Sequence, residues 1–371
     1  MIGADPHQGG ATWSVLQYLL GFEALGHEVH LIEPVSEKGL GAAGTALAET
    51  ASGRYFMNVT ASYGLERSAT MLRTETRESI GLSYPQLVEL GQSADVLINI
   101  SGMLEDPAII ESIPVRAYLD LDPAFVQLWH TQGVDMRFDG HTHFVTVAQA
   151  IGNKSCLVPR CGIEWITTFQ PLVLSWWPVA MDLEWDALTT VGNWRAYGSV
   201  EHEGVFFGQK AHSLRPLMSL PRFTREKFCM AMAIHPDDGA DIAALKDSGW
   251  WLIDPLQVSA TPADYQRFIR GSWAEFGISK SGYVTSRCGW FSDRSICYLA
   301  SGRPVIAQDT GFSEYLPTGE GLLAFNTTDD VLNALQSLRS NYDAHSGAAR
   351  RLAETYFDSQ KVLPSLLERL L

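Results

Sequence analysis

The chain has 371 residues, of which 46% are hydrophobic and 19% are charged. This composition excludes a disordered or fibrous protein, and the length predicts two domains that each bury a core. The formal net charge of −15 disfavours nucleic acid and anionic membrane surfaces as partners, because an acidic surface repels both.

The cysteines are an odd number spread over a long chain, at Cys156, Cys161, Cys229, Cys288 and Cys297. They do not predict a disulfide framework, and Cys156 and Cys161 lack the second pair that a structural zinc site needs. The sequence shows no run of about 20 apolar residues and no signal peptide pattern. We therefore expect a cytoplasmic protein without a transmembrane segment.

Helix-like and strand-like stretches alternate, which predicts an α/β protein that begins with one β-α-β unit. Residues 1–5 read as the end of a first strand, and a turn, a helix over 11–25 and a strand over 29–32 follow. Gly9 and Gly10 in the turn would let the backbone approach an anion at the start of the helix. A plain tight turn is the alternative interpretation of the same two glycines.

Three further strands are predicted at 95–100, 115–123 and 143–147. Asp120 and Asp122 come at the end of the second of these strands. Strand ends of this kind line the cleft of an open α/β sheet, so both carboxylates are candidates for a site.

The segment 172–186 is rich in tryptophan and proline and is predicted to link two domains, at residues 1–178 and 179–371. The second domain repeats the plan of strand, glycine-bearing loop and helix, as a second Rossmann-like domain would. Its predicted strands are 189–194, 228–234 (or a short helix), 250–254, 274–279, 304–307 and 320–325, and its predicted helices are 268–273, 293–301 and 329–339.

Three motifs in this second half carry a resemblance to a known family. They are AEFGISKSGY (274–283), SDRSICYLASGRPVIAQDTGFSEYL (292–316) and GEGLLAF (319–325). Together they resemble the donor-binding region of GT-B glycosyltransferases, of the kind found in retaining enzymes that use nucleotide sugars. There a strand ends in E-x-F-G, a helix reads like LEAMAxGxPVIA, and a GxxE turn and a GxGLLV strand follow.

The resemblance implies two Rossmann-like domains that face each other across a deep cleft, with the last helix packing back on the first domain. It also implies a nucleotide-sugar donor, most often a UDP-sugar, and no further cofactor. TTVGNW (189–194) and the Gly26-His27-x-Val29 pattern extend the resemblance more weakly, and the whole is most similar to a divergent bacterial branch.

The donor site implied by the resemblance departs from the family pattern at two positions. Asn193 stands where an arginine normally holds the diphosphate, so that Lys210 or Arg195 would supply the cation. Cys297 falls near the position of the glutamate that binds the ribose, and Asp293 is the nearest acid. The candidate donor-binding residues are Gly9, Gly10, Asn193, Lys210, Lys280, Ser292, Asp293, Arg294, Gly311 and Glu314.

Some of these residues have structural alternatives. Lys280 could be a surface lysine, Asp293 a helix cap and Arg294 one half of a structural ion pair. Their functional and structural interpretations both stay open at this point.

An inverting enzyme would need a general base in the first domain, whereas a retaining enzyme would not. His7 is the first candidate, and Asp120 and Asp122 are candidates for the base or for contacts to the acceptor. The D-x-D pattern of the two acids also suggests a metal, but it lies in the wrong domain for a metal-dependent donor site, so no metal is expected. His141 and His143 remain open as a base, an acceptor contact or core residues.

The predicted reaction is metal-independent transfer of a hexose-like unit to a hydroxyl of a small molecule or glycan, with an amine as the alternative acceptor group. The alternatives are a non-catalytic nucleotide-sugar or glycan-binding protein of the same fold, and a sugar-nucleotide epimerase. A dinucleotide oxidoreductase is disfavoured because the first turn lacks the GxGxxG fingerprint. Donor, acceptor, stereochemistry and oligomeric state stay open.

Overall fold

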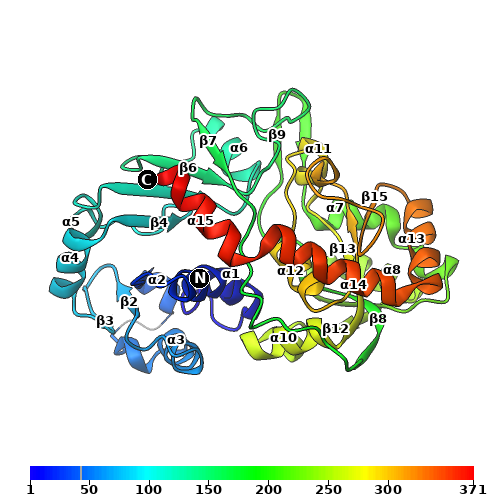
Figure 1. The fold of residues 1–371 in the computed structure, drawn as a ribbon, viewed down its shortest axis with the longest axis horizontal. Helices are drawn as coiled ribbons and strands as arrows, with labels where there is room; N and C mark the ends of the chain where they lie inside the picture. Colours follow the sequence, from blue (N-terminus) through cyan, green and yellow to red (C-terminus); the bar gives the residue numbers. More distant parts are fainter. Residues whose placement is uncertain (42–43) are drawn as a thin grey trace.

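The computed structural model describes residues 1–41 and 44–371, and their strands gather in two lobes (Figure 1). We call the part that holds the strands between residues 31 and 167 the N-terminal lobe, and the part that holds those between 185 and 325 the C-terminal lobe. This is the α/β architecture that the sequence predicts. Within the described residues, no helix combines the length and the apolar character that crossing a membrane requires.

The N-terminal lobe contains two small sheets. In one, β1 pairs in parallel with β2, which pairs antiparallel with β3, and in the other β4 to β7 run parallel in chain order. The strands are β1 (Leu31–Val35), β2 (Ala69–Arg73), β3 (Ser79–Ile80), β4 (Val96–Ile100), β5 (Val115–Asp120), β6 (His143–Thr146) and β7 (Trp165–Thr167). The helices are α1 (Gly9–Ala24), α2 (Glu37–Leu40), α3 (Ala51–Ser62), α4 (Tyr84–Ser93), α5 (Pro107–Ile110) and α6 (Phe125–Thr131).

Residues 1–5 are not part of a strand, so this prediction is wrong. The backbone N–H groups of Ile2 and Ala4 instead donate to the carboxylate of Glu33 on β1, at 2.9 and 2.6 Å. A buried side chain thus supplies the acceptors that a neighbouring strand would otherwise provide.

The C-terminal lobe is built on one parallel sheet with the order β12-β11-β8-β13-β14-β15, beside a hairpin of β9 and β10. The strands are β8 (Trp185–Asn193), β9 (Val200–His202), β10 (Val205–Phe207), β11 (Phe228–Ala233), β12 (Trp251–Ile253), β13 (Ser272–Gly277), β14 (Val305–Gln308) and β15 (Leu322–Phe325). The helices are α7 (Lys210–Leu214), α8 (Gly239–Ser248), α9 (Leu256–Ser259), α10 (Pro262–Gly271), α11 (Ser281–Ser286), α12 (Asp293–Ala300), α13 (Thr328–Ser340) and α14 (Tyr342–Leu352).

The order of this sheet reverses direction between β8 and β13. From β8 the chain adds β11 and β12 on one side, then returns to add β13, β14 and β15 on the other. In doubly wound sheets the ligand lies at the carboxyl ends of the strands at such a switch point.

The structure decides between two alternatives for one segment of this lobe and corrects the bounds of another. The segment 228–234 is a strand, because its run of Phe, Met and Ala is buried on both faces of a parallel sheet. The helix predicted at 268–273 begins earlier and ends at Gly271, so that β13 takes in Ser272 and Trp273.

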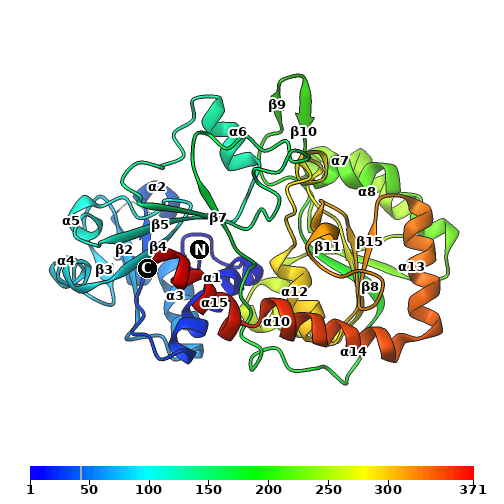
Figure 2. The same ribbon diagram turned by 45° about the horizontal axis from the view of Figure 1, so that its top comes forward.

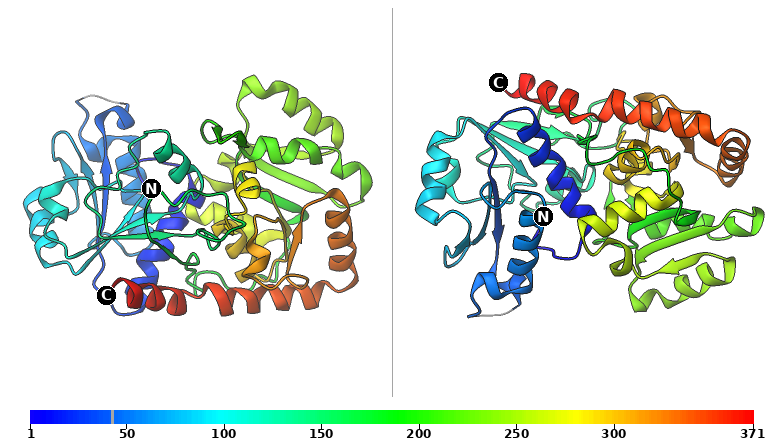
Figure 3. Two further views of the ribbon diagram at one scale, coloured as in Figure 1. Left: turned by 90° about the horizontal axis from the view of Figure 1, so that it is seen from above. Right: turned by 60° about the horizontal axis from the view of Figure 1, so that its bottom comes forward.

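Helix α1 belongs to the N-terminal lobe but packs on the C-terminal lobe. Figure 3 shows it end to end with α10. Trp13 lies in one apolar cluster with Phe268 of α10 and Ile296 of α12, and its indole N–H donates to the carbonyl of Pro262 at 2.8 Å. The two lobes therefore share one apolar core at this point.

The C-terminal helix α15 (Ser359–Leu370) crosses from the C-terminal lobe to the N-terminal lobe, beside α1 (Figure 2). Leu363, Leu366 and Leu370 pack with Tyr18 and Phe22 of α1 in one buried cluster. The chain thus returns to the N-terminal lobe, while the domain boundary at residue 178 stays a prediction.

We expect Gly9→Ala to lower the free energy of unfolding by about 1–3 kcal/mol, since added atoms in a packed interface force shifts. A Cβ on Gly9 would press against the carbonyl of Thr261, closer than van der Waals contact. Urea denaturation measures the change. Gly239→Ala is the matched control, because a Cβ there meets no atom within 4 Å. Equal stability of the two variants would contradict the packing of α1 on α10.

Candidate active site

The switch point between β8 and β13 carries a group of cationic side chains. β8 ends in Gly192 and Asn193, α7 begins with Lys210, and α12 brings in Arg294. Gly192 has φ +154°, and a Cβ there would lie 2.8 Å from Lys210 Nζ and 3.9 Å from Arg294 Nη1. Both cations thus lie at the end of β8, and the absence of a side chain at Gly192 leaves room for Lys210.

Lys210 is half-buried, and its ammonium donates no hydrogen bond to any of the described residues. Burial and the positive charges of Arg294 and Lys280 together lower the pKa of Lys210 to about 7. An ammonium group whose pKa is lowered by other cations favours an anion as its missing partner.

Arg294 is held from two sides. Its Nε donates to Glu275 Oε1 at 2.6 Å, and its Nη1 donates to the carbonyl of Val191 at 3.1 Å. The side chain is 7% exposed and that of Glu275 is 0% exposed. Its Nη2 donates to no acceptor in the described part of the chain, so one edge of the guanidinium is available to a ligand.

Helix α12 begins beside these cations. Its N-cap, Ser292, makes no side-chain capping bond, which leaves free N–H groups at the positive end of the helix. A small cavity of about 10 Å³, enough for roughly one water molecule, adjoins the helix start. It is lined by Gly277, Ser279, Trp290, Phe291, Ser292, Arg294, Ser295, Ala307, Gln308 and Phe312.

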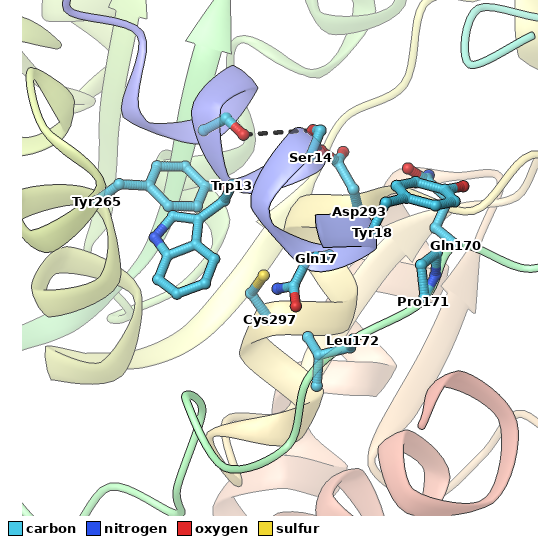
Figure 4. Close-up of a pocket in the computed structure, with 11 residues that line it drawn as sticks. Trp13, Ser14, Gln17, Tyr18, Gln170, Pro171, Leu172, Tyr265, Asp293 and Cys297 are labelled. Carbon is cyan, nitrogen blue, oxygen red and sulfur yellow. Dashed lines mark hydrogen bonds between the residues drawn. The ribbon is translucent and has the colours of Figure 1, made fainter. Parts of the chain in front are cut away.

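Asp293, the first residue of α12, contacts the N-terminal lobe. Ser14 of α1 donates to its carboxylate at 2.5 Å, and the same hydroxyl lies 3.3 Å from the carbonyl of Gly10 (Figure 4). A second small cavity here is also lined by Cys297, Gln17 and Tyr18. Asp293 thus joins the two lobes, and its predicted contact with ribose stays a prediction.

Lys280 and Asp122, predicted separately as a donor contact and a catalytic residue, form an ion pair between the lobes. Lys280 Nζ lies 2.9 and 2.8 Å from the two carboxylate oxygens, and the hydroxyls of Tyr197 and Tyr283 also donate to Asp122. The ammonium faces the rings of Phe125, Tyr197 and Tyr283 at 5.1, 4.2 and 5.1 Å. Burial lowers the pKa of Lys280, and Asp122 opposes this effect.

Asp120 is completely buried behind this ion pair. Its carboxylate accepts hydrogen bonds from Gln127, Thr146 and the backbone N–H of Asp122, at 2.8, 2.8 and 2.9 Å. Burial raises the pKa of Asp120 to about 6, although the hydrogen bonds lower it. Asp120 therefore anchors the loop that carries Asp122, and its predicted catalytic role stays a prediction.

His7, the first candidate base, is exposed and has φ +67°. Its ring packs edge-on against Tyr55 at 5.1 Å. Gly9 and Gly10 face α10, where a Cβ on Gly10 would lie 2.9 Å from the ring of Tyr265. Gly9 and Gly10 therefore lie at the interface of the lobes, whereas His7 packs on Tyr55 of its own lobe.

Gly311 and Glu314 lie on the turn after β14. Gly311 has φ +93°, a conformation that suits glycine, and Glu314 forms a half-exposed ion pair with Arg287 at 2.6 Å. The histidines have polar partners of their own: His141 lies 3.0 Å from the amide of Asn99, and His143 lies 2.9 Å from Thr142. Within residues 1–41 and 44–371, no group of three metal-binding side chains could hold an ion.

Several residues of the site were not predicted from the sequence. Glu275 of the AEFG motif lies on β13, as the predicted strand 274–279 implies, but its contact with Arg294 was not predicted. The available signal was an acidic residue within a predicted buried strand, a short distance along the chain before a predicted arginine. Tyr197 and Tyr283 carried no signal, because their approach to Asp122 depends on how the lobes meet.

Comparisons with known proteins define the fold. No family model matches the chain, and no curated protein matches its sequence. Among solved structures, alpha-glucosyltransferase (AGT) in complex with UDP gives a TM-score of 0.58 at 11% identity, over 98% of this chain and 96% of that one. Anabaena Alr3699/HepE in complex with UDP and glucose gives 0.52 at 11%, over 77% and 80%.

AviGT4, a glycosyltransferase of avilamycin A biosynthesis, gives a TM-score of 0.52 at 13% identity, over 98% of this chain and 90% of that chain. The chain therefore has the GT-B fold of two Rossmann-like lobes, as the three motifs implied.

The buried Asp120 gives a pH-dependent prediction. Its folded pKa of about 6 lies above the ordinary 3.8, so the native state binds this proton more tightly than the unfolded chain does. Its contribution to stability is present below about pH 4 and is lost as the pH rises toward 6, by up to about 3 kcal/mol.

Asp120→Asn carries no such titration, so it should gain stability relative to the wild type between pH 4 and 6. Urea denaturation at several pH values measures this difference. Asp186→Asn is the control, because that side chain is 75% exposed. Parallel curves for the wild type and Asp120→Asn would contradict the assignment.

Proposed function

We propose that this protein transfers a hexose-like sugar from a nucleoside diphosphate sugar to a hydroxyl group of a small molecule or glycan. The observation that carries the proposal is the pair of cations with free N–H groups, Lys210 and Arg294, at the switch point of a GT-B fold. The alpha-glucosyltransferase and HepE structures of the same fold were solved with UDP or UDP-glucose.

The chemistry of the leaving group explains why cations are needed there. As the glycosidic bond to the diphosphate breaks, negative charge grows on the diphosphate, and fixed positive groups stabilise that state more than the ground state. Lys210, Arg294 and the free N–H groups of α12 would supply this stabilisation by themselves. We therefore propose a metal-independent reaction in which Ser292 and Asn193 border the same anion.

The remaining predicted residues keep their proposed roles. Asp122 lies on the N-terminal lobe and faces the donor cations through Lys280, which suits a contact to the acceptor hydroxyl. His7 is a second candidate for the base if the reaction inverts. Asp293, Gly311 and Glu314 stay proposed contacts for the ribose or the transferred sugar.

The net charge of −15 favours a small molecule or glycan over nucleic acid as the acceptor. One solved neighbour is described as an alpha-glucosyltransferase in complex with UDP-glucose and DNA, with a TM-score of 0.55 at 10% identity, over 92% of this chain and 99% of that chain. Donor turnover with and without DNA tests this preference, and stimulation by DNA would overturn it.

The second candidate function is a non-catalytic protein that binds a nucleotide sugar or glycan. It is favoured by the Lys280–Asp122 ion pair, which engages the predicted acceptor carboxylate, and by Cys297 near the position of the ribose glutamate. Release of free sugar or nucleotide from the donor separates the two functions, because a binding protein would give saturable binding without turnover.

A thermal-shift screen with UDP, GDP, ADP, TDP and their sugars tests the donor site directly. A ligand that binds only the folded state raises the melting temperature, and we expect this for at least one diphosphate. If none of these ligands changes the melting temperature, the proposed donor site is wrong.

The lowered pKa of Lys210 predicts how donor affinity depends on pH. Below about pH 7 the ammonium is charged and attracts the diphosphate, and a bound anion raises its pKa. Above that pH, binding must take up a proton, so the affinity for UDP-glucose should fall by up to about tenfold per pH unit.

Isothermal titration calorimetry between pH 6 and 8.5 measures this dependence. Lys210→Met should bind weakly and with little dependence on pH. Lys246→Met, at an exposed lysine of α8, is the control and should follow the wild type. An affinity of the wild type that stays constant over this range would contradict the role of Lys210.

A further inference from the structure

The ion pair between Glu275 and Arg294 lies directly beneath the proposed diphosphate site. Glu275 is on β13, in register with Thr189 of β8, and its side chain is completely buried. Arg294 comes from the first turn of α12, and the two side chains meet at 2.6 Å. The pair therefore joins the two strands of the switch point to the helix that begins there.

Arg294 occupies an unfavourable position for a cation. The N-terminus of a helix carries partial positive charge, and a buried guanidinium without a partner costs several kcal/mol. Lys210 adds a second positive charge close by. Only a buried anion on the opposite side makes this arrangement of charges stable before a ligand arrives.

The side chain of Glu275 has no other partner among the described residues. Its Oε1 accepts the Nε–H of Arg294, while its Oε2 is buried and accepts no hydrogen bond. A buried carboxylate oxygen without a partner is costly, so packing or local stability alone does not account for Glu275.

The contacts on Arg294 fix which edge of the guanidinium stays free. Glu275 holds Nε and Val191 holds Nη1, which places two of the three nitrogens on the protein side. A planar guanidinium held at two points cannot rotate, so its free Nη2 keeps one direction. Arg294 also lines the small cavity at the start of α12, together with Ser279, Ser292 and Ser295.

We infer that Glu275 is a positioning residue that holds Arg294 ready to bind the diphosphate of the donor. This inference rests on the proposed function and adds to it a residue that does not touch the substrate. Glu275 compensates the charge of the buried guanidinium and holds its orientation, so that little reorganisation is needed when the diphosphate binds.

The test compares ligands with and without phosphate, using Glu275→Gln, Arg294→Met and the double variant. UDP and inorganic pyrophosphate probe the anion site, and uridine probes the site without it. Glu275→Gln should weaken UDP and pyrophosphate binding by about tenfold or more while uridine affinity changes less than about twofold. In the Arg294→Met background, Glu275→Gln should cause almost no further loss.

The matched control is Glu78→Gln, which removes the carboxylate beside the buried Arg73 on β2. It should leave UDP affinity unchanged. If Glu275→Gln does not fold, Glu275→Asp replaces it. This variant keeps the charge but retracts it by one methylene group, and its affinities for UDP, pyrophosphate and uridine are compared in the same way.

The outcomes separate the inference from the proposed function. If the wild type binds neither UDP nor pyrophosphate, the proposed function is overturned together with the inference. If the wild type binds both and Glu275→Gln binds them equally well, the inference alone is overturned. Additive losses in the double variant would also overturn it, because Glu275 would then act independently of Arg294.

Discussion

The packing of α1 against α10 and α12 is the constraint on which the rest of the structure depends. Trp13 enters an apolar cluster of the C-terminal lobe, and Gly9 and Gly10 remove the side chains that would keep the helices apart. A large apolar interface opposes the relative motion that two lobes otherwise have. The arrangement therefore fixes where the carboxyl end of β5 meets the switch point between β8 and β13.

Once the lobes are held in this way, charges from both sides meet over a short distance. Asp122 from the N-terminal lobe pairs with Lys280 from the C-terminal lobe, and Asp120 holds the loop beneath it. The positive charges of Lys280 and Arg294 both lower the pKa of Lys210, so the three cations form one cluster. The buried anions support this positive cluster but leave two of its cations with free N–H groups.

The sequence predicted the parts of this arrangement that follow from local patterns. The strands β4, β5, β6 and β8, the helix α12 and the sites of Lys210 and Arg294 came from periodicity and from motifs along the chain. The partners of these residues came from contacts between distant segments, which no local pattern encodes. Glu275 and Arg294 lie on different elements, and only the packing of α12 against β13 brings the carboxylate to the guanidinium. The strand prediction for residues 1–5 was wrong for the same reason, since hydrogen bonds in this segment depend on Glu33, which lies on β1.

The acidic net charge and the cationic site together determine which anionic ligands the protein can bind. A net charge of −15 repels extended polyanions, which would need many contacts on the surface. A single diphosphate needs only a few fixed cations, and in a partly buried site their interaction with it is stronger than in water. Burying those cations is unfavourable. Glu275 compensates the charge of Arg294 and Asp122 that of Lys280, whereas burial lowers the pKa of Lys210, which has no carboxylate partner among the described residues. The cation left without a carboxylate is therefore the one whose charge depends most on the arrival of an anion.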